Sequence, residues 1–223
     1  MLRFAVLFAF VAPVFAADLS SFTNKETATA LKDALSQGAQ TAVAQLGQAD
    51  GFLQNPKVKI PLPDNLKKVE KAMRFAGMGK QADDLVVTMN RAAETAVPEA
   101  QTLLIDSVKK MSVTDAKNIL SGGDDAATQY FRKTTQEQLT KKFLPIVKDA
   151  TDKVGLAQQY NSFAATGAQF GLVKGDDAKV ESYVTKKALD GLYLMIAEQE
   201  KALRADPVKA TSSLVQKIFG AMK

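Results

Sequence analysis

The sequence predicts an all-α protein, built as a single-domain bundle of about eight or nine helices with one Pro-rich extended arm. Apolar residues recur every three or four positions through nearly all of the 223-residue chain, which is the period of an amphipathic helix. Capping residues and glycines divide this pattern into segments of helical length. No alternation of strands and helices is present, which excludes Rossmann and P-loop nucleotide-binding architectures.

Residues 1–16, MLRFAVLFAFVAPVFA, are typical of a secretory signal peptide. Arg3 supplies the positive start, and an unbroken apolar run follows. Val14 and Ala16 occupy the minus-three and minus-one positions of a small-residue cleavage site. The run is much shorter than the roughly 20 residues that span a bilayer. A short anchor at the membrane surface is the alternative. We therefore expect a periplasmic or secreted helical domain of residues 17–223, without a transmembrane segment.

The composition excludes several classes of function. The chain has neither cysteine nor histidine, so it has no disulfide, no Ser-His-Asp or Cys-His nucleophile and no imidazole or thiolate ligand for zinc. Its formal charge is +5, with lysines interspersed among acidic residues. This pattern suits an anionic envelope surface and gives no support for nucleic-acid binding. We predict no cofactor.

The first helix is predicted over residues 23–47. Thr23 and Glu26 form a capping box at its start, and Gly47 is suited to end it. The apolar stripe of this helix consists of Leu31, Leu35, Ala39, Ala42 and Leu46.

A Pro-rich segment follows at residues 50–65, DGFLQNPKVKIPLPDN. Its prolines exclude a regular helix, and Val58, Ile60 and Leu62 alternate with other residues. We interpret it as an extended arm whose apolar side chains lie on the body of the protein. A short edge strand is the alternative.

Helical patterns return after the arm. One helix is predicted over residues 64–77 and a longer pattern over 79–111, in which Pro98 either kinks one helix or starts a second. Ser112 and Asp115 then form the capping box of a short helix.

The second half of the chain is also predicted to be helical. Apolar positions continue over residues 126–163 with an interruption at Pro145, and a glycine-containing loop occupies 165–177. A long helix is predicted over 177–204, and Pro207 opens the last one.

The tetrapeptide Gly-Asp-Asp-Ala occurs twice, each time before a predicted helix. We expect Asp124 and Asp176 to be N-caps and Asp125 and Asp177 to lie in the first helical turn. The alternative is that the two loops converge and these carboxylates bind a hard cation such as calcium or magnesium. No EF-hand spacing accompanies them.

Two further groups are candidates for ligand binding. Asn90 and Glu94 are four residues apart on one helix face beside Arg91, where they line a polar pocket if buried or form surface pairs if exposed. Aromatic residues of the second half form either core or a ligand cage. The candidate ligand-binding residues are Met89, Asn90, Arg91, Glu94, Tyr130, Phe131, Tyr160 and Phe163.

Five segments also carry a family resemblance: DGFLQNPKVKIPLP, MNRAAETAVPEA, GGDDAATQYFR, KFLPIVKDATDKVGLAQQYN and FGLVKGDDAKVESYVTKKALDGLYLMIAEQEKALRADP. Together, over about residues 31–219, they resemble the bacterial domain-of-unknown-function family 4197. The resemblance implies an exported, helical envelope protein that forms one unit. It brings no assigned activity, cofactor or catalytic residues.

The leading functional hypothesis is non-catalytic binding of an apolar or amphipathic ligand, such as a lipid or fatty acid. Its basis is the set of amphipathic helices with methionine and aromatic faces, together with an arm that can cover a groove. One alternative is an envelope protein that contacts an anionic surface or a protein partner through its lysines. A carboxylate-based or divalent-metal-dependent hydrolase is the third hypothesis. The oligomeric state stays open.

Overall fold

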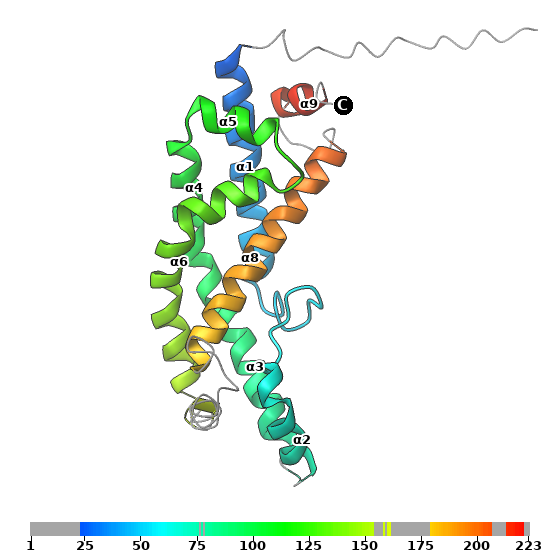
Figure 1. The fold of residues 1–223 in the computed structure, drawn as a ribbon, viewed down its shortest axis with the longest axis vertical. Helices are drawn as coiled ribbons and strands as arrows, with labels where there is room; N and C mark the ends of the chain where they lie inside the picture. The colour runs from blue at the N-terminus through cyan, green and yellow to red at the C-terminus, as the bar shows by residue number, and fades with distance from the viewer. Residues whose placement is uncertain are drawn as a thin grey trace, which may run out of the picture.

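The structure is a computed structural model that describes residues 23–75, 77, 79–153, 158, 160–161, 179–206 and 213–220. The protein is an all-α single domain, and no strand occurs in these ranges (Figure 1). Its body is a bundle of six helices: α1 (Asn24–Leu46), α3 (Gly79–Ala96), α4 (Ala100–Lys110), α5 (Val113–Leu120), α6 (Ala126–Asp152) and α8 (Val180–Ala205). Two short helices lie at its ends: α2 (Lys67–Phe75) and α9 (Ser213–Gly220).

The bundle of six helices is smaller than the predicted bundle of eight or nine, because α2 and α9 lie at its ends and one predicted interruption, at Pro145, is absent. The expected interruption at Pro145 is wrong, because Pro145 lies inside the continuous helix α6. Proline removes one backbone hydrogen bond, but Phe143 and Val147 are fully buried on either side of it and hold the helix in place. At Pro98 the chain does leave the helix, in the 3-10 turn η3 (Val97–Glu99), and the second-helix interpretation is confirmed.

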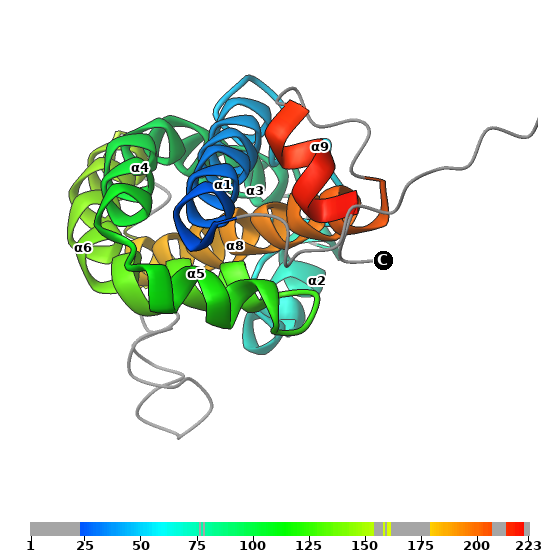
Figure 2. The same ribbon diagram turned by 90° about the horizontal axis from the view of Figure 1, so that it is seen from above.

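Helix α1 lies inside the bundle, between α4, α5 and α8 (Figure 2). Its predicted apolar stripe is buried throughout. The capping box is confirmed: Thr23 Oγ1 accepts a hydrogen bond from the Glu26 N–H at 3.2 Å, and the Glu26 carboxylate accepts one from the Thr23 N–H at 2.9 Å. The Glu26 carboxylate also accepts a hydrogen bond from the Thr23 hydroxyl, and this bond lowers the pKa of Glu26. Gly47 is the C-cap, as predicted, and the capping box of Ser112 and Asp115 opens α5.

The two longest helices, α6 and α8, pack along each other and carry much of the aromatic core. Phe131 and Phe143 of α6 and Tyr193 of α8 are completely buried. The Tyr193 hydroxyl lies 3.0 Å from Thr135 Oγ1, so the ring enters the core with its polar atom satisfied. The core interpretation is therefore confirmed for these three aromatic residues.

Residues 51–63 form neither helix nor strand, so the edge-strand alternative is wrong. The segment is an arm, but it is not extended throughout, because residues 51–54 and 56–58 form turns. The arm lies against α3 and α8, with Phe52, Val58, Ile60 and Leu62 buried. Gly191 of α8 makes room for it, because a Cβ atom at this glycine would lie 2.8 Å from the ring of Phe52.

Helix α2 and the first turns of α3 project from the body at the end opposite α5 and α9 (Figure 1). The 3-10 turn η2 (Asp64–Leu66) leads from the arm into α2, and α2 packs against α3. Among the helices that the structure describes, none combines the length and apolar character needed to cross a bilayer.

Candidate functional site

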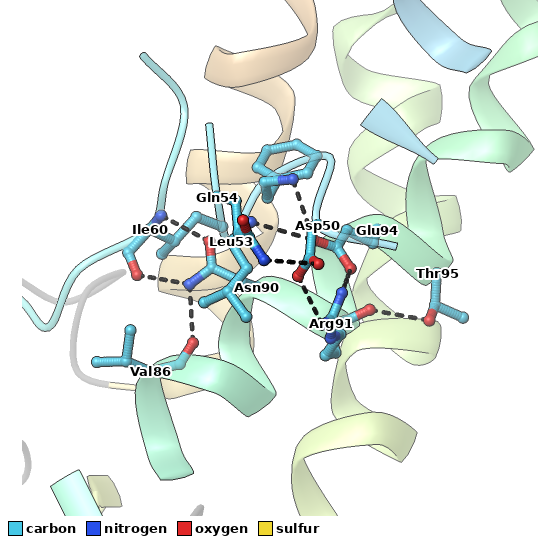
Figure 3. A network of polar contacts seen from close by, with 10 residues as sticks. Asp50, Leu53, Gln54, Ile60, Val86, Asn90, Arg91, Glu94 and Thr95 are labelled. Atoms are coloured by element: carbon cyan, nitrogen blue, oxygen red, sulfur yellow. Dashed lines mark hydrogen bonds and ion pairs between the residues drawn. The ribbon is translucent and has the colours of Figure 1, made fainter. Parts of the chain in front are cut away.

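The predicted polar group on α3 anchors the arm (Figure 3). Asn90 is completely buried. Its Oδ1 accepts a hydrogen bond from the Ile60 N–H at 2.8 Å, and its Nδ2 donates to the Ile60 carbonyl at 2.9 Å and to the Val86 carbonyl at 2.7 Å. The amide thus bonds both backbone groups of Ile60, as a neighbouring strand would.

Glu94 holds the other end of the arm. Its Oε1 accepts hydrogen bonds from the backbone N–H groups of Phe52 and Leu53, at 3.0 and 3.1 Å. Arg91 donates from Nη1 to Glu94 Oε2 and from Nη2 to Asp50 Oδ1, both at 2.7 Å. Asp50 has a φ of 68°, in the left-handed region, and the bond from Arg91 helps to fix this turn.

These contacts show that Asn90 and Glu94 are buried polar groups and not surface pairs. Their hydrogen bonds go to the arm and to Val86 and Arg91 of α3, so the polar face that the sequence offered to a ligand is occupied by the chain itself. Met89 is buried completely in the core beside them.

The first Gly-Asp-Asp loop does not cap α6 as predicted. Asp124 is exposed, and Asp125, which occupies the N-cap position, makes no side-chain bond to the helix backbone. Instead Asp125 Oδ2 accepts a hydrogen bond from the side chain of Gln129 at 2.9 Å. The capping interpretation of Asp124 is therefore wrong, because a more distant carboxylate takes the free N–H groups of this helix.

That carboxylate is Glu200 of α8. It accepts hydrogen bonds from the backbone N–H groups of Ala127 and Thr128, at 3.0 and 3.1 Å, and from Thr128 Oγ1 at 3.1 Å. Arg204 donates to Glu200 from Nε and Nη2, at 3.2 and 2.9 Å, and to the Ile119 carbonyl at 2.9 Å. A buried negative charge is thus paired with arginine at the positive end of α6.

The metal alternative needs several ligating side chains close together. In the described part of the chain, no cluster of three or more potential metal-ligating side chains is found. Asp176 and Asp177 of the second Gly-Asp-Asp loop lie outside the residues that the structure describes. Convergence of the two loops on a cation stays a prediction.

A cavity of about 250 Å³ lies between α1 and α8, next to the Glu200–Arg204 pair. Its wall is mainly apolar, and Phe131 is the one ligand candidate from the sequence that lines it. Glu200 and Arg204 contribute charged groups, whose side chains are 4% and 14% exposed. The main apolar residues of the wall are Leu31, Ala34, Leu35, Phe131, Ile196 and Leu203.

Tyr130 and Tyr160 do not line this cavity. Tyr130 lines a separate hollow of about 210 Å³ with Asp115 and Lys133, and its hydroxyl donates to the Ser107 carbonyl at 2.9 Å. Burial raises the pKa of Tyr130. Tyr160 is buried, and Phe163 lies outside the described ranges.

Sequence reasoning missed the residues of α1 and α8 that form the cavity, because their spacing is that of ordinary core positions. One signal was available. Gly38 lies in the middle of α1, where glycine weakens a helix, and it lines the cavity.

Comparison with known proteins agrees with the resemblance found in the sequence. Residues 21–220 match the model of a family described as "Protein of unknown function (DUF4197)". No curated protein and no solved structure matches the chain.

Proposed function

The chain belongs to the DUF4197 family, whose description assigns no activity, and from its geometry we propose that it binds one small apolar or amphipathic molecule in the cavity between α1 and α8. The proposal includes export, which rests on the signal-peptide pattern of residues 1–16. Binding then takes place in the periplasm or outside the cell.

The observation that carries the proposal is the size and lining of the cavity. At about 250 Å³ it is larger than the dry apolar cavity of about 150 Å³ that holds a benzene molecule. It is smaller than the range of about 300–1,000 Å³ that is usual for drug-sized ligands. A single short acyl chain or a ring therefore fits it better than a lipid with two chains.

Polar groups at the cavity can orient such a ligand. Gln37, Gln199 and Arg204 lie in its wall beside the apolar residues. Arg204 donates hydrogen bonds from Nε and Nη2 to Glu200 and from Nη2 to the Ile119 carbonyl. Because Glu200 already balances the charge of Arg204 and Asp206 lies in the same wall, a neutral hydroxyl or carbonyl head group suits the site better than a carboxylate does.

A hydrolase is supported less well. Asp124 and Asp125 are exposed, and the buried carboxylates of Glu94 and Glu200 are engaged by backbone N–H groups and arginine. Carboxylates held in this way fix the positions of chain segments. A catalytic acid or base needs a carboxylate that can reach a substrate.

Gly38 provides the test. A Cβ atom at this position would meet Gln199 Cβ at 3.5 Å, so alanine fits, while the longer side chain of Gly38→Leu extends into the cavity. We would titrate residues 17–223 with decanoate and with decanol and count bound molecules by native mass spectrometry. We expect one molecule per chain in the wild type and in Gly38→Ala, and at least tenfold weaker binding in Gly38→Leu.

Circular dichroism and thermal unfolding of both variants establish that the fold is kept. Equal binding by Gly38→Leu and Gly38→Ala would place the ligand elsewhere. An absence of binding of either probe by the wild type would overturn the proposal for short-chain ligands.

A further inference from the structure

The end of the molecule formed by α2 and the start of α3 has a surface that the cavity does not explain. We call residues 67–80 the tip. It projects from the body of the bundle, and α2 packs there against α3 and the preceding turn η2 (Figure 1). Gly77 adopts a φ of 76° within the turn that reverses the chain, a conformation that glycine adopts without strain.

An aromatic ring at this turn is almost completely exposed to solvent. Phe75, the last residue of α2, is 97% exposed, whereas the next most exposed large apolar residue, Val113, is 45% exposed. The sequence around the turn, FAGMG, has no polar side chain. The Phe75 ring packs against almost nothing in its own fold. Its apolar surface is therefore available for contact with a membrane or with another molecule.

The tip also concentrates positive charge. Five of its fourteen residues are basic and one is acidic, a formal +4, and the whole chain carries +5. Lys80 is 85% exposed, and Lys67 and Lys71 are also exposed. The tip's basic residues are Lys67, Lys68, Lys71, Arg74 and Lys80.

Acidic residues next to the tip reduce this positive charge: with Asp64, Asp83 and Asp84 included, residues 64–84 carry a formal +1. Asp64 pairs with Lys67, Asp84 with Lys80, and both Glu70 and Asp83 with Arg74. Exposed ion pairs of this kind are weak and exchange readily with other anions. Among the charged residues, Arg74 and Lys80 lie nearest the turn and the Phe75 ring, whereas Lys67 is at the start of α2, about two helical turns away.

We infer that the tip docks onto an anionic lipid surface, with the Phe75 ring entering the headgroup region and the surrounding lysines and Arg74 meeting the lipid phosphates. An apolar residue rimmed by cations on a short amphipathic helix is the chemistry of an interfacial anchor. One ring and a few cations give weak and reversible attachment. The inference is independent of the cavity and of any ligand bound there.

The chain contains no tryptophan, so Phe75→Trp introduces a single fluorescent reporter at the tip. The matched control is Val113→Trp, at the opposite end of the molecule. We would add vesicles of phosphatidylcholine, alone or with phosphatidylglycerol, to each variant of residues 17–223. With phosphatidylglycerol present, we expect the emission of Phe75→Trp to shift to shorter wavelength and to be quenched by brominated acyl chains. Val113→Trp should show neither change.

Co-sedimentation with the same vesicles tests the two components separately. Phe75→Ser and Lys71→Glu should each weaken binding at least fivefold, and 0.5 M salt should weaken wild-type binding, because charges on a surface are screened. Both residues are exposed, so circular dichroism should be unchanged. Equal emission shifts in the two tryptophan variants, or no shift in either, would overturn the inference. A shift of Phe75→Trp that grows with protein concentration without vesicles would identify a second copy as the occupant.

Discussion

Two buried glutamates, Glu94 and Glu200, do similar work at different places in the bundle. Each accepts hydrogen bonds from two consecutive backbone N–H groups of a segment far away in the sequence, and each is paired with an arginine on its own helix. Glu94 fixes the arm to α3, and Glu200 fixes the start of α6 to α8. Backbone N–H groups lose their hydrogen bonds to water when they are buried, and each glutamate supplies the acceptor that replaces the water.

The two sites differ in how much solvent reaches them and in what lies beside them. The side chain of Arg91 is 41% exposed and has Asp50 as a second carboxylate partner, whereas that of Arg204 is 14% exposed. At Glu94 the neighbouring space is filled by the arm. At Glu200 it contains the cavity. The same arrangement of glutamate, arginine and backbone N–H groups therefore lies under the arm at one place and borders the cavity at the other.

The largest expected effect is at Glu200. In Glu200→Ala, two backbone N–H groups of α6 and the Thr128 hydroxyl lose their acceptor, and the poorly exposed Arg204 loses its counter-charge. Breaking a buried pair in this way costs about 3–5 kcal/mol of unfolding free energy, measured by urea denaturation. The control is Glu198→Ala, which removes a more exposed pair with Lys57 and should cost less than about 1 kcal/mol. Equal losses would show that Glu200 is not the structural carboxylate.

A smaller loss is expected at Glu94. Glu94→Ala leaves the N–H groups of Phe52 and Leu53 without an acceptor, for about 2–4 kcal/mol in total, while Arg91 keeps Asp50 and access to water. The effect should be local, so trypsin should cut the arm after Lys57 or Lys59 faster than in the wild type. If Glu200→Ala accelerates the same cleavage under native conditions, the two sites are not separate.

Asn90 tests the second attachment of the arm. Asn90→Ala removes both hydrogen bonds to Ile60 and should lower the free energy of unfolding by about 1–3 kcal/mol. Thr95→Ala on the exposed face of the same helix serves as the control and should change it by less than about 0.5 kcal/mol. Losses of similar size in the two variants would assign the effect to α3 itself and not to the arm.

The smallest effect is expected where the sequence predicts a helix cap. Asp124→Ala should change the free energy of unfolding by no more than about 0.5 kcal/mol, because Glu200 and not this exposed carboxylate bonds the first turn of α6. A loss near 1 kcal/mol or more in urea denaturation, which is the usual value of an N-cap, would restore the sequence interpretation.

The sequence was sufficient where the interacting residues are close along the chain. The capping boxes at Thr23 and Ser112 involve partners three residues away, and the stripe of α1 follows from helical period alone. The all-α class and the non-helical arm were predictable for the same reason. Pro145 was misjudged because burial on both sides of it, which a local rule does not include, outweighs the missing hydrogen bond.

The candidate site was predictable only in part, because its bonds join distant segments. The spacing of Asn90 and Glu94 identified a polar face, but their partners lie 30 to 42 residues earlier, in the arm. Glu200 and Arg204 have the spacing of an ordinary surface pair, so nothing local marks their burial. The cavity depends on residues with small side chains or none, such as Gly38. A sequence pattern that is read from the large apolar residues does not reveal such a space.

The position of the arm has a consequence for folding rates. Besides its bonds to α3, the arm reaches α8 through Tyr183, whose hydroxyl donates to the Pro61 carbonyl across 122 residues, and through Lys57 and Glu198 across 141. We expect contacts that close such long loops to form late in folding. Interactions that are absent from the folding transition state mainly control how fast the native state is lost. We therefore expect the hollow at Gly191, which receives Phe52, to set the lifetime of the folded protein more than the speed at which it folds.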